Sequence, residues 1–234
     1  MDERGAVTAV VLLDYNGVVV DDEPLHFAAL RDVLAVERIA LDQATYDAHF
    51  LGFDDRAGIG VAFRLAGRPL APDANRTLAA RKARWYAEAT RTGVPLVPGV
   101  GRFVREAAAR ARIAVVSGAL RAEVRAGLLQ AGIAELVECI VGAEDVVHGK
   151  PDPEGLRLAL AKLTGGSAAR VVVVEDSLPG LAAARALGAG CVALTTAHDG
   201  RALDGADLVW TSFEGHAASE LEPLLRPVEP AAHA

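Results

Sequence analysis

Short runs of apolar residues recur along the chain, separated by stretches in which apolar positions follow a helical spacing. The runs are continuously apolar rather than alternating, which predicts strands covered on both faces by other elements. They cover residues 7–13, 113–116, 136–141, 171–174, 191–194 and 208–210. The pattern therefore predicts an α/β protein with a mainly parallel sheet and helices packed on both faces.

One interval, residues 22–95, breaks this alternation because it contains helical spacing but no strand pattern. Helices are expected over residues 25–36, 42–50, 56–65 and 75–90. The interval therefore predicts an inserted α-helical subdomain, and the proline and glycine residues of 92–99 would end its last helix.

The end of the chain lacks a strand or helix pattern. Residues 226–234 include two prolines and several small residues, and they are expected to form a frayed tail.

Composition narrows the class of partner. The 234 residues are 52% hydrophobic and 24% charged, which is typical of a globular protein with a sizeable core. A formal net charge of −7 argues against a nucleic-acid or membrane-surface partner, since both need a basic patch, and favours a small molecule. The oligomeric state is left open, and a monomer is compatible with these features.

The two cysteines indicate a reducing compartment. Cys139 and Cys191 both lie within apolar runs, where a cysteine behaves as a small buried hydrophobe. The first apolar run is too short to span a bilayer and lacks a signal-peptide cleavage pattern. We therefore expect a cytoplasmic protein.

Polar residues follow the predicted carboxyl ends of several strands. They are Asp14-Tyr-Asn16-Gly-Val, Ser117-Gly118, Gly149-Lys150-Pro and Glu175-Asp176. In a doubly wound sheet the carboxyl ends of the strands share one crevice, where ligands bind. The sequence therefore predicts a single site built from these segments.

These motifs, in this order, resemble those of the haloacid dehalogenase superfamily. The similarity is to the branch of β-phosphoglucomutase-like phosphatases with a small helical cap of the C1 type, and it covers nearly the whole chain. That branch carries Asp-x-Asp-Gly-Val, then a run like residues 20–26 here, then Ser or Thr, Gly-Lys-Pro and an acidic pair. The resemblance implies a Rossmann-like core, residues 1–21 and 96–234, and a cap, residues 22–95.

The resemblance also implies a role for each carboxylate. Asp14 would attack phosphorus and form an aspartyl-phosphate, which divides one difficult displacement into two easier ones. Mg²⁺ prefers oxygen ligands, and Asp14, Asp176 and the backbone carbonyl of Asn16 would hold it. Glu175 would either share the metal or lie just outside its ligands.

The remaining core residues would bind the phosphoryl group. The Ser117 hydroxyl and the Gly118 amide can donate hydrogen bonds to its oxygens, while Lys150 would neutralise charge that develops in the transition state. The chain has only three lysines, which makes the lysine at position 150 more informative.

The cap is expected to contribute substrate contacts. A glycine-centred segment, residues 50–56, would present Arg56 to the substrate. Arg81 and Lys82 are further candidates, with solvated helix charges as the alternative. His26 on the first cap helix would transfer a proton, bind substrate or serve a structural role; the sequence leaves these open.

Simpler interpretations exist for some of these residues. Asn16-Gly17 is also a two-residue β-hairpin signal, although the other motifs favour a site. Ser177 and Gly188 predict the start and end of a helix. Asp152-Pro153 would be a cap and first helical position. Glu144-Asp145 has two interpretations, the acidic metal-binding pair or a loop or capping feature, and the second is favoured because the pair follows a different strand.

Asn16 departs from the family pattern, which has an aspartate there as general acid and base. An amide cannot protonate a leaving oxygen or activate water. Either the substrate has a good leaving group, or His26, Asp22 or Glu23 supplies the proton. A third hypothesis is that the asparagine is engineered, or that the Asn-Gly bond deamidates to aspartate.

Together these features predict a Mg²⁺-dependent phosphatase that acts on a small phosphorylated metabolite through Asp14. The alternatives are a weakened enzyme that only binds a phosphorylated metabolite as a sensor, a β-phosphoglucomutase-like mutase, and a metal-independent haloacid dehalogenase. The mutase is disfavoured because returning phosphate to a sugar needs the missing acid/base residue. The dehalogenase is disfavoured because Glu175-Asp176 indicates a metal that it would not require.

Overall fold

The computed structural model describes residues 7–51, 53, 55–196 and 203–229. Within them a parallel sheet has the strand order β3-β2-β1-β4-β5-β6, which confirms the predicted α/β fold. The strands are β1 (Thr8–Leu13), β2 (Arg112–Val116), β3 (Val137–Val141), β4 (Ala169–Glu175), β5 (Gly190–Leu194) and β6 (Leu208–Trp210). Valine-rich β1 and β4 lie side by side at the centre and are almost wholly buried, as continuous apolar runs require.

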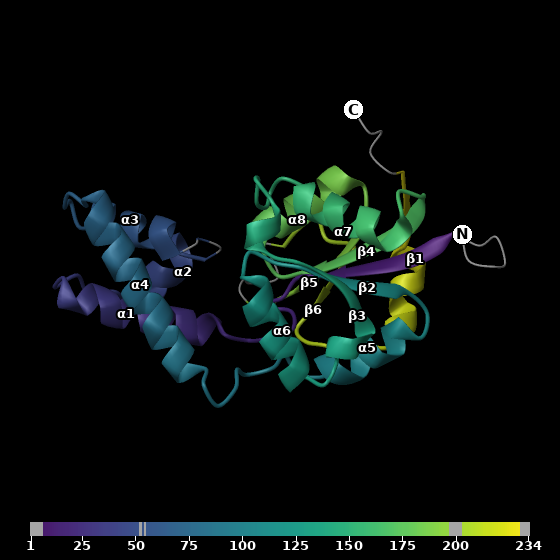
Figure 1. Ribbon diagram of the computed structural model, residues 1–234, viewed down its shortest axis with the longest axis horizontal. Coiled ribbons are helices and arrows are strands. Elements are labelled where there is room, and N and C mark those ends of the chain that lie inside the picture. The colour runs from purple at the N-terminus through teal and green to yellow at the C-terminus, as the bar shows by residue number, and fades with distance from the viewer. Residues whose placement is uncertain (1–6, 52, 54, 197–202, 230–234) are drawn as a thin grey trace. The chain divides into compact units, whose positions relative to one another are not determined.

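Helices cover both faces of this sheet (Figure 1). On one face lie α7 (Glu154–Thr164) and α8 (Leu178–Leu187), and on the other lie α5 (Val100–Ala108) and α6 (Arg121–Gln130). Leu156, Leu160 and Leu181 pack on the sheet residues Leu12 and Val173 in one buried cluster. This packing fixes α7 and α8 against the sheet.

The predicted frayed tail is wrong for its first residues. Arg226–Val228 forms β7, which pairs antiparallel with the start of β4, following the short 3-10 helix η3 (Ala218–Leu224). The pairing of β4 with β5 begins only at Val172, so the preceding residues of β4 offer unpaired backbone groups. β7 pairs with these residues and buries Val228. Residues 230–234 lie outside the described part of the chain.

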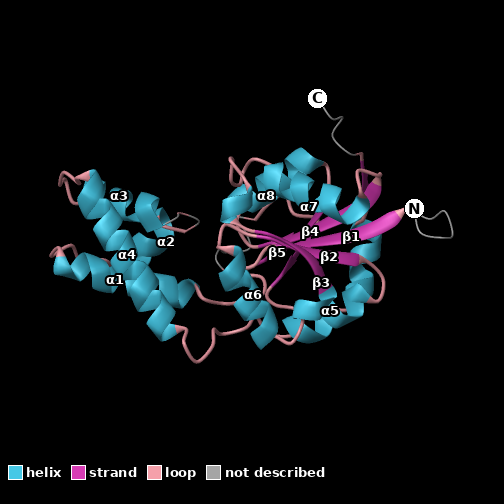
Figure 2. Ribbon diagram, in the orientation of Figure 1, coloured by secondary structure: helices cyan, strands magenta, loops and turns pink. Residues whose placement is uncertain are grey.

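A smaller compact unit, Asp22–Val94, consists of helices, and the larger unit comprises Met1–Asp21 and Pro95–Ala234. The helices are α1 (Glu23–Val36), α2 (Gln43–His49), α3 (Asp55–Leu65) and α4 (Pro72–Ala89) (Figure 2). They enclose a separate apolar core that includes Leu34, Ile59 and Phe63. The smaller unit therefore has its own packing. None of the described helices is both long and apolar enough to cross a membrane.

The helix ends largely follow the sequence signals. The Ser177 hydroxyl accepts a hydrogen bond from the Gly180 amide at the start of α8, and Gly188 ends that helix in the left-handed region. The prediction for α7 is wrong by one residue. Asp152 accepts a hydrogen bond from the Glu154 amide, as the predicted cap would, but α7 begins at Glu154, so Pro153 precedes the first helical residue instead of occupying it.

Glu144 and Asp145 act as caps, as one of their two interpretations predicted. Asp145 accepts a hydrogen bond from the Gly142 amide over 2.8 Å, and Glu144 accepts one from the Arg121 amide at the start of α6. They therefore hold the loop after β3 and take no part in the acidic pair of β4.

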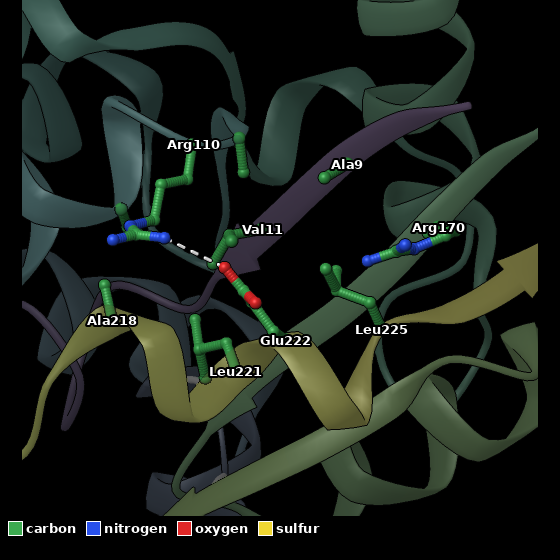
Figure 3. Close-up of a pocket in the computed structure, with 10 residues that line it drawn as sticks. Ala9, Val11, Arg110, Arg170, Ala218, Leu221, Glu222 and Leu225 are labelled. Carbon is green, nitrogen blue, oxygen red and sulfur yellow. Dashed lines mark hydrogen bonds and ion pairs between the residues drawn. The ribbon is translucent and has the colours of Figure 1, made fainter. Parts of the chain in front are cut away.

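A hollow of about 300 Å³ lies at the amino-terminal end of β1 and β4 (Figure 3). Small side chains such as Ala9 and Ala218 form its walls, and an ion pair of 2.9 Å joins Arg110 and Glu222 at its rim. Arg170 lies on the other side in the same view. The hollow is at the opposite end of the strands from Asp14 and Glu175, and neither of these residues lines it.

Candidate functional site

The carboxyl ends of β1, β2 and β4 bring the predicted core motifs together. The amide of Asp14 donates to the carbonyl of Val174 over 2.9 Å, so the ladder between β1 and β4 continues to this residue. The amide of Ser117 likewise donates to the Val141 carbonyl at the end of β3 over 3.0 Å. Parallel pairing therefore places Asp14, Ser117 and Glu175 at the same edge of the sheet.

The Asn16-Gly17 pair forms a turn but not the two-stranded hairpin that one interpretation predicted. Gly17 has a φ of 70°, and its amide donates to the carbonyl of Val20 over 2.7 Å. Amides of residues 18–20 all donate to the carbonyl of Tyr15. The chain therefore coils tightly after β1 instead of reversing beside it, which keeps Asn16 close to Asp14.

Lys150 joins two of the carboxylates. Its Nζ lies 2.9 Å from Oδ1 of Asp14 and also donates a hydrogen bond to Oε1 of Glu175. Asp14 Oδ1 accepts a further hydrogen bond from the Tyr15 amide over 2.7 Å. Among the described residues none donates a hydrogen bond to Oδ2 of Asp14, so none of them competes for this oxygen.

Burial and charge shift the protonation of this cluster in opposite directions. Burial opposes the charge on Lys150, but Asp14 and Glu175 outweigh it and raise the pKa of the lysine. Burial would raise the pKa of Glu175, but Lys150 outweighs it and holds that pKa below its ordinary value. Burial, followed by the charge of Glu175, raises the pKa of Asp14 to about 7. Without a cation, the site thus carries more negative charge than Lys150 balances.

This shift predicts how stability depends on pH in the absence of metal. Asp14 keeps its proton up to about pH 7 in the folded protein but loses it near 3.8, its ordinary value, when the chain unfolds. Unfolding between these values releases a proton, so the free energy of unfolding contributed by Asp14 falls as pH rises through this window. Urea denaturation in EDTA at several pH values should show a shallower fall for Asp14→Asn. An identical slope in both proteins would contradict the shift.

The acidic residues have the chemistry and spacing of a site for a hard cation. One oxygen each from Asp14, Glu175 and Asp176 lies within 4.8 Å of the others. Oxygen ligands of this kind suit Mg²⁺. The excess negative charge beside the partly buried Lys150 also fits a bound cation. The residues that are present therefore fit the metal that the sequence implied.

Glu175 is held by hydrogen bonds to both of its carboxylate oxygens. Its Oε2 accepts hydrogen bonds from the amides of Asp176 and Ser177 and from the Ser177 hydroxyl, over 2.9 to 3.1 Å. Its Oε1 accepts from Lys150. With both oxygens engaged, Glu175 is better suited to orient Lys150 than to bind metal directly.

Ser117 lies next to Asn16. Its hydroxyl donates to Oδ1 of Asn16 at 3.5 Å, at the limit for a hydrogen bond, and accepts a hydrogen bond from the Ala119 amide over 3.0 Å. Gly118 is exposed beside it. A serine hydroxyl so weakly attached to its neighbour can turn toward a phosphoryl oxygen, as the phosphate-binding prediction requires.

His26 and Arg56 belong to the smaller unit, where His26 lies in a polar network. Its Nε2 is 3.2 Å from Asp22, and its Nδ1 is 3.0 Å from Nζ of Lys82. An ammonium group only donates, so Nδ1 must accept and Nε2 must carry the proton toward Asp22. His26 therefore acts as a fixed link between two charged groups in this arrangement.

Two other predictions for the smaller unit have different outcomes. The description of Lys82 as a solvated helix charge is wrong, because Lys82 is 5% exposed and forms an ion pair with Asp55. Arg56 lies exposed near the start of α3. Gly52 and Asp54 of the predicted substrate segment lie outside the described residues.

Sequence reasoning missed Thr196. Its hydroxyl donates to the carbonyl of Gly17 over 2.6 Å and lies 3.3 Å from Oδ2 of Asp176. The available signal was its position, because Thr196 follows the apolar run of β5 just as the other site residues follow theirs. Unlike Ser117, Thr196 belongs to none of the motifs from which the site was predicted.

Comparison with known proteins extends this picture. The family model of the haloacid dehalogenase-like hydrolases matches residues 8–188. This range includes all the motifs predicted for the core, and Thr196 lies beyond it. The chain belongs to the haloacid dehalogenase-like hydrolases. This membership confirms the resemblance drawn from the motifs, and the phosphatase branch of the family is supported by its named relatives.

Among curated relatives of this hydrolase, validoxylamine A 7'-phosphate phosphatase of Streptomyces hygroscopicus subsp. limoneus is 37% identical over 100 residues. The match covers 43% of this chain and 46% of that protein, less than half its length. Phosphoglycolate phosphatase of Rhodospirillum rubrum is 31% identical over 191 residues, 79% of this chain and 78% of that one.

A solved structure shows the same architecture. CbbY from Rhodobacter sphaeroides, solved in complex with phosphate, superposes with a TM-score of 0.77 at 26% identity. The superposition covers 92% of this hydrolase and 99% of CbbY. Both the sheet and the inserted helices therefore have counterparts in a phosphate-binding relative.

Proposed function

We propose that this chain is a phosphatase that hydrolyses a small phosphorylated metabolite through a covalent phosphoryl group on Asp14. The observation that carries the proposal is the arrangement of Asp14, which has one oxygen held by Lys150 and the Tyr15 amide. Its other oxygen accepts no hydrogen bond from the described residues and is thus the one suited to attack. The named relatives, which are phosphatases, support the same reaction.

In the first step, Oδ2 of Asp14 would attack phosphorus while the bond to the leaving oxygen breaks. Lys150 is positioned to balance the negative charge that develops on the phosphoryl oxygens, and Glu175 keeps the ammonium group oriented. The Ser117 hydroxyl would donate to one of those oxygens. Groups that are already oriented lower the barrier because they need not reorganise during the reaction.

In the second step, water attacks the phosphoryl group and releases phosphate from Asp14. Asn16 cannot take a proton from that water, nor could it have protonated the leaving oxygen in the first step. We therefore propose that the enzyme works best on substrates with good leaving groups, and that hydrolysis of the phosphoenzyme is its slow step.

A divalent cation has a place in this proposal. Asp14, Asp176 and the backbone carbonyl of Asn16 would hold Mg²⁺, with Glu175 supporting Lys150. When bound, Mg²⁺ supplies charge neutralisation between the carboxylate and the phosphoryl group, which otherwise repel each other.

The test is a panel of phosphorylated substrates assayed for phosphate release with Mg²⁺ and with EDTA. The panel includes 2-phosphoglycolate, hexose phosphates, validoxylamine A 7'-phosphate, an acyl phosphate and pyrophosphate. Native protein should hydrolyse at least one of them only with Mg²⁺, and Asp14→Asn should lose this activity completely. Asp73→Asn, which changes an exposed aspartate on α4, is the matched control and should retain it.

Two further readouts sharpen this test. Mass spectrometry of acid-quenched protein should find the phosphoryl group on the peptide that contains Asp14, and the same data reveal whether Asn16 has deamidated. Hydrolysis that persists in Asp14→Asn would overturn the proposal, and hydrolysis that persists in EDTA would remove the metal from it.

A second function, binding without turnover, is favoured by one observation. Asn16 stands where the family pattern has the acid/base residue, while Ser117 contacts Asn16 and Lys150 contacts Asp14. In that case isothermal titration calorimetry would detect binding of a phosphorylated metabolite to the native protein, while the phosphate-release assay would detect no product.

A further inference from the structure

The end of β5 contributes to the acidic site through Thr196. Parallel pairing of β4 with β5 aligns Glu175 with Ala193, so the chain beyond Leu194 runs past the residues that follow β4. The amide of Thr195 still donates to the Trp210 carbonyl over 2.9 Å, which anchors this extension to β6. Thr196 is thereby placed by the sheet itself.

The Thr196 hydroxyl touches two parts of the site at once. It donates to the carbonyl of Gly17 over 2.6 Å, and it lies 3.3 Å from Oδ2 of Asp176. A hydroxyl has one proton, so the shorter contact to the carbonyl is the stronger bond. Thr196 therefore links the Asn16-Gly17 turn to the chain that runs beside Asp176.

Gly17 shows independently how close these groups are. A Cβ at this position would lie 1.8 Å from Oδ2 of Asp176 and 2.9 Å from Oγ1 of Thr196. The Asp176 carboxylate thus occupies the space that any other residue at position 17 would fill. Its φ of 70° also favours glycine there.

This arrangement relates two of the proposed metal ligands to each other. The peptide between Asn16 and Gly17 carries the Asn16 carbonyl, and the next carbonyl along the chain is the one that Thr196 holds. Rotation of the Gly17 peptide would move the first carbonyl and would also disturb the contact with Asp176. The Thr196 hydroxyl therefore restrains the Gly17 peptide by a hydrogen bond and lies in contact with the Asp176 carboxylate.

We propose that Thr196 is a positioning residue for the divalent-cation site, acting through the Gly17 carbonyl and the Asp176 carboxylate. The inference rests on the proposed function in one respect: the bound ion is taken to be Mg²⁺, the cation proposed for the phosphatase reaction. Residues that orient metal ligands without touching the metal typically change metal affinity by about 10- to 100-fold when replaced. We expect that loss when the Thr196 hydroxyl is removed.

The experiment compares Thr196→Val, which keeps the shape but loses the hydroxyl, with Thr196→Ser, which keeps the hydroxyl. Thr195→Val makes the same change one residue earlier and is the matched control. Mn²⁺ binding is measured by the loss of the free-ion electron paramagnetic resonance signal, and Mg²⁺ binding by competition against Mn²⁺. Thermal unfolding in EDTA shows whether each variant is folded.

The expected result is Mg²⁺ binding weaker by about 10- to 100-fold in Thr196→Val. Binding should be close to native in Thr196→Ser and in Thr195→Val, with all variants melting cooperatively in EDTA. Native affinity in a folded Thr196→Val would overturn the assignment, as would equal losses in Thr196→Ser and Thr196→Val.

Failure of the phosphatase proposal has a different signature. A native protein that binds Mn²⁺ and hydrolyses nothing would remove the reaction, yet weakened binding in Thr196→Val would still support the role of Thr196. A native protein that binds no Mn²⁺ would overturn both the cation site and this inference.

Discussion

Replacing Asn16 with aspartate is expected to raise the rate of phosphomonoester hydrolysis by on the order of 10²- to 10⁴-fold. The carboxyl group would sit where the amide now lies beside Ser117, within reach of the leaving oxygen and of the attacking water. The gain should be largest for substrates with poor leaving groups and small for acyl phosphates, because only the former need protonation. Steady-state rates on a series of phosphates with graded leaving-group pKa values measure this difference.

A double variant controls for the origin of the gain. Asp14→Asn combined with Asn16→Asp should be inactive, because the new carboxylate serves as acid and base but not as nucleophile. Activity in the double variant would mean that residue 16 can attack phosphorus itself. An equal gain for acyl phosphates and sugar phosphates would contradict the role of Asn16. Turnover in Asn16→Asp alone, with none in the native chain, would favour the binding function.

Replacing Lys150 with methionine should lower the hydrolysis rate and also destabilise the protein. Removing one preorganised charge-stabilising donor typically costs about 10²- to 10³-fold in rate. Lys150 is also the counter-ion of Asp14 and Glu175, and its loss leaves buried carboxylates uncompensated, which typically costs about 3–5 kcal/mol. Initial rates and urea denaturation in EDTA measure the two effects separately.

The matched control is Lys162→Met, which removes an exposed lysine on α7 and should change neither quantity appreciably. Combining Lys150→Met with Glu175→Gln should restore part of the stability, since one of the buried charges is gone, but none of the activity. Full stability in Lys150→Met would show that the carboxylates are hydrated enough to do without their counter-ion.

The sequence predicted much of the core because its signals are local. Continuous apolar runs determine β1 and β4. The carboxyl ends of parallel strands lie at one edge of the sheet, so Asp14, Ser117 and Glu175 could be placed together from the sequence. β7 was not predicted because Arg226–Val228 has little strand character of its own. It forms a strand only because the start of β4 leaves unpaired backbone groups beside it.

The contacts of uncharged or distant residues were harder to predict. Thr196 has no charge and no distinctive neighbours, and its contact with Gly17 spans 179 positions of sequence. The burial of Lys82 depends on Asp55 and His26, which come from other helices, so its own helical spacing suggested an exposed side chain. Such contacts depend on how elements pack, which local patterns do not record.

The two chain segments that lead into and out of the smaller unit are hydrogen-bonded to each other within the larger one. The amide of Asp21 donates to the carbonyl of Pro95 over 2.8 Å, and Val20 pairs with Leu96 next to it. An insertion whose two ends meet in this way can be lengthened, shortened or exchanged without altering the register of the sheet. The strand-end residues Asp14, Ser117 and Glu175 can therefore be inherited unchanged while the insertion diverges, because both of its junctions lie within the larger unit.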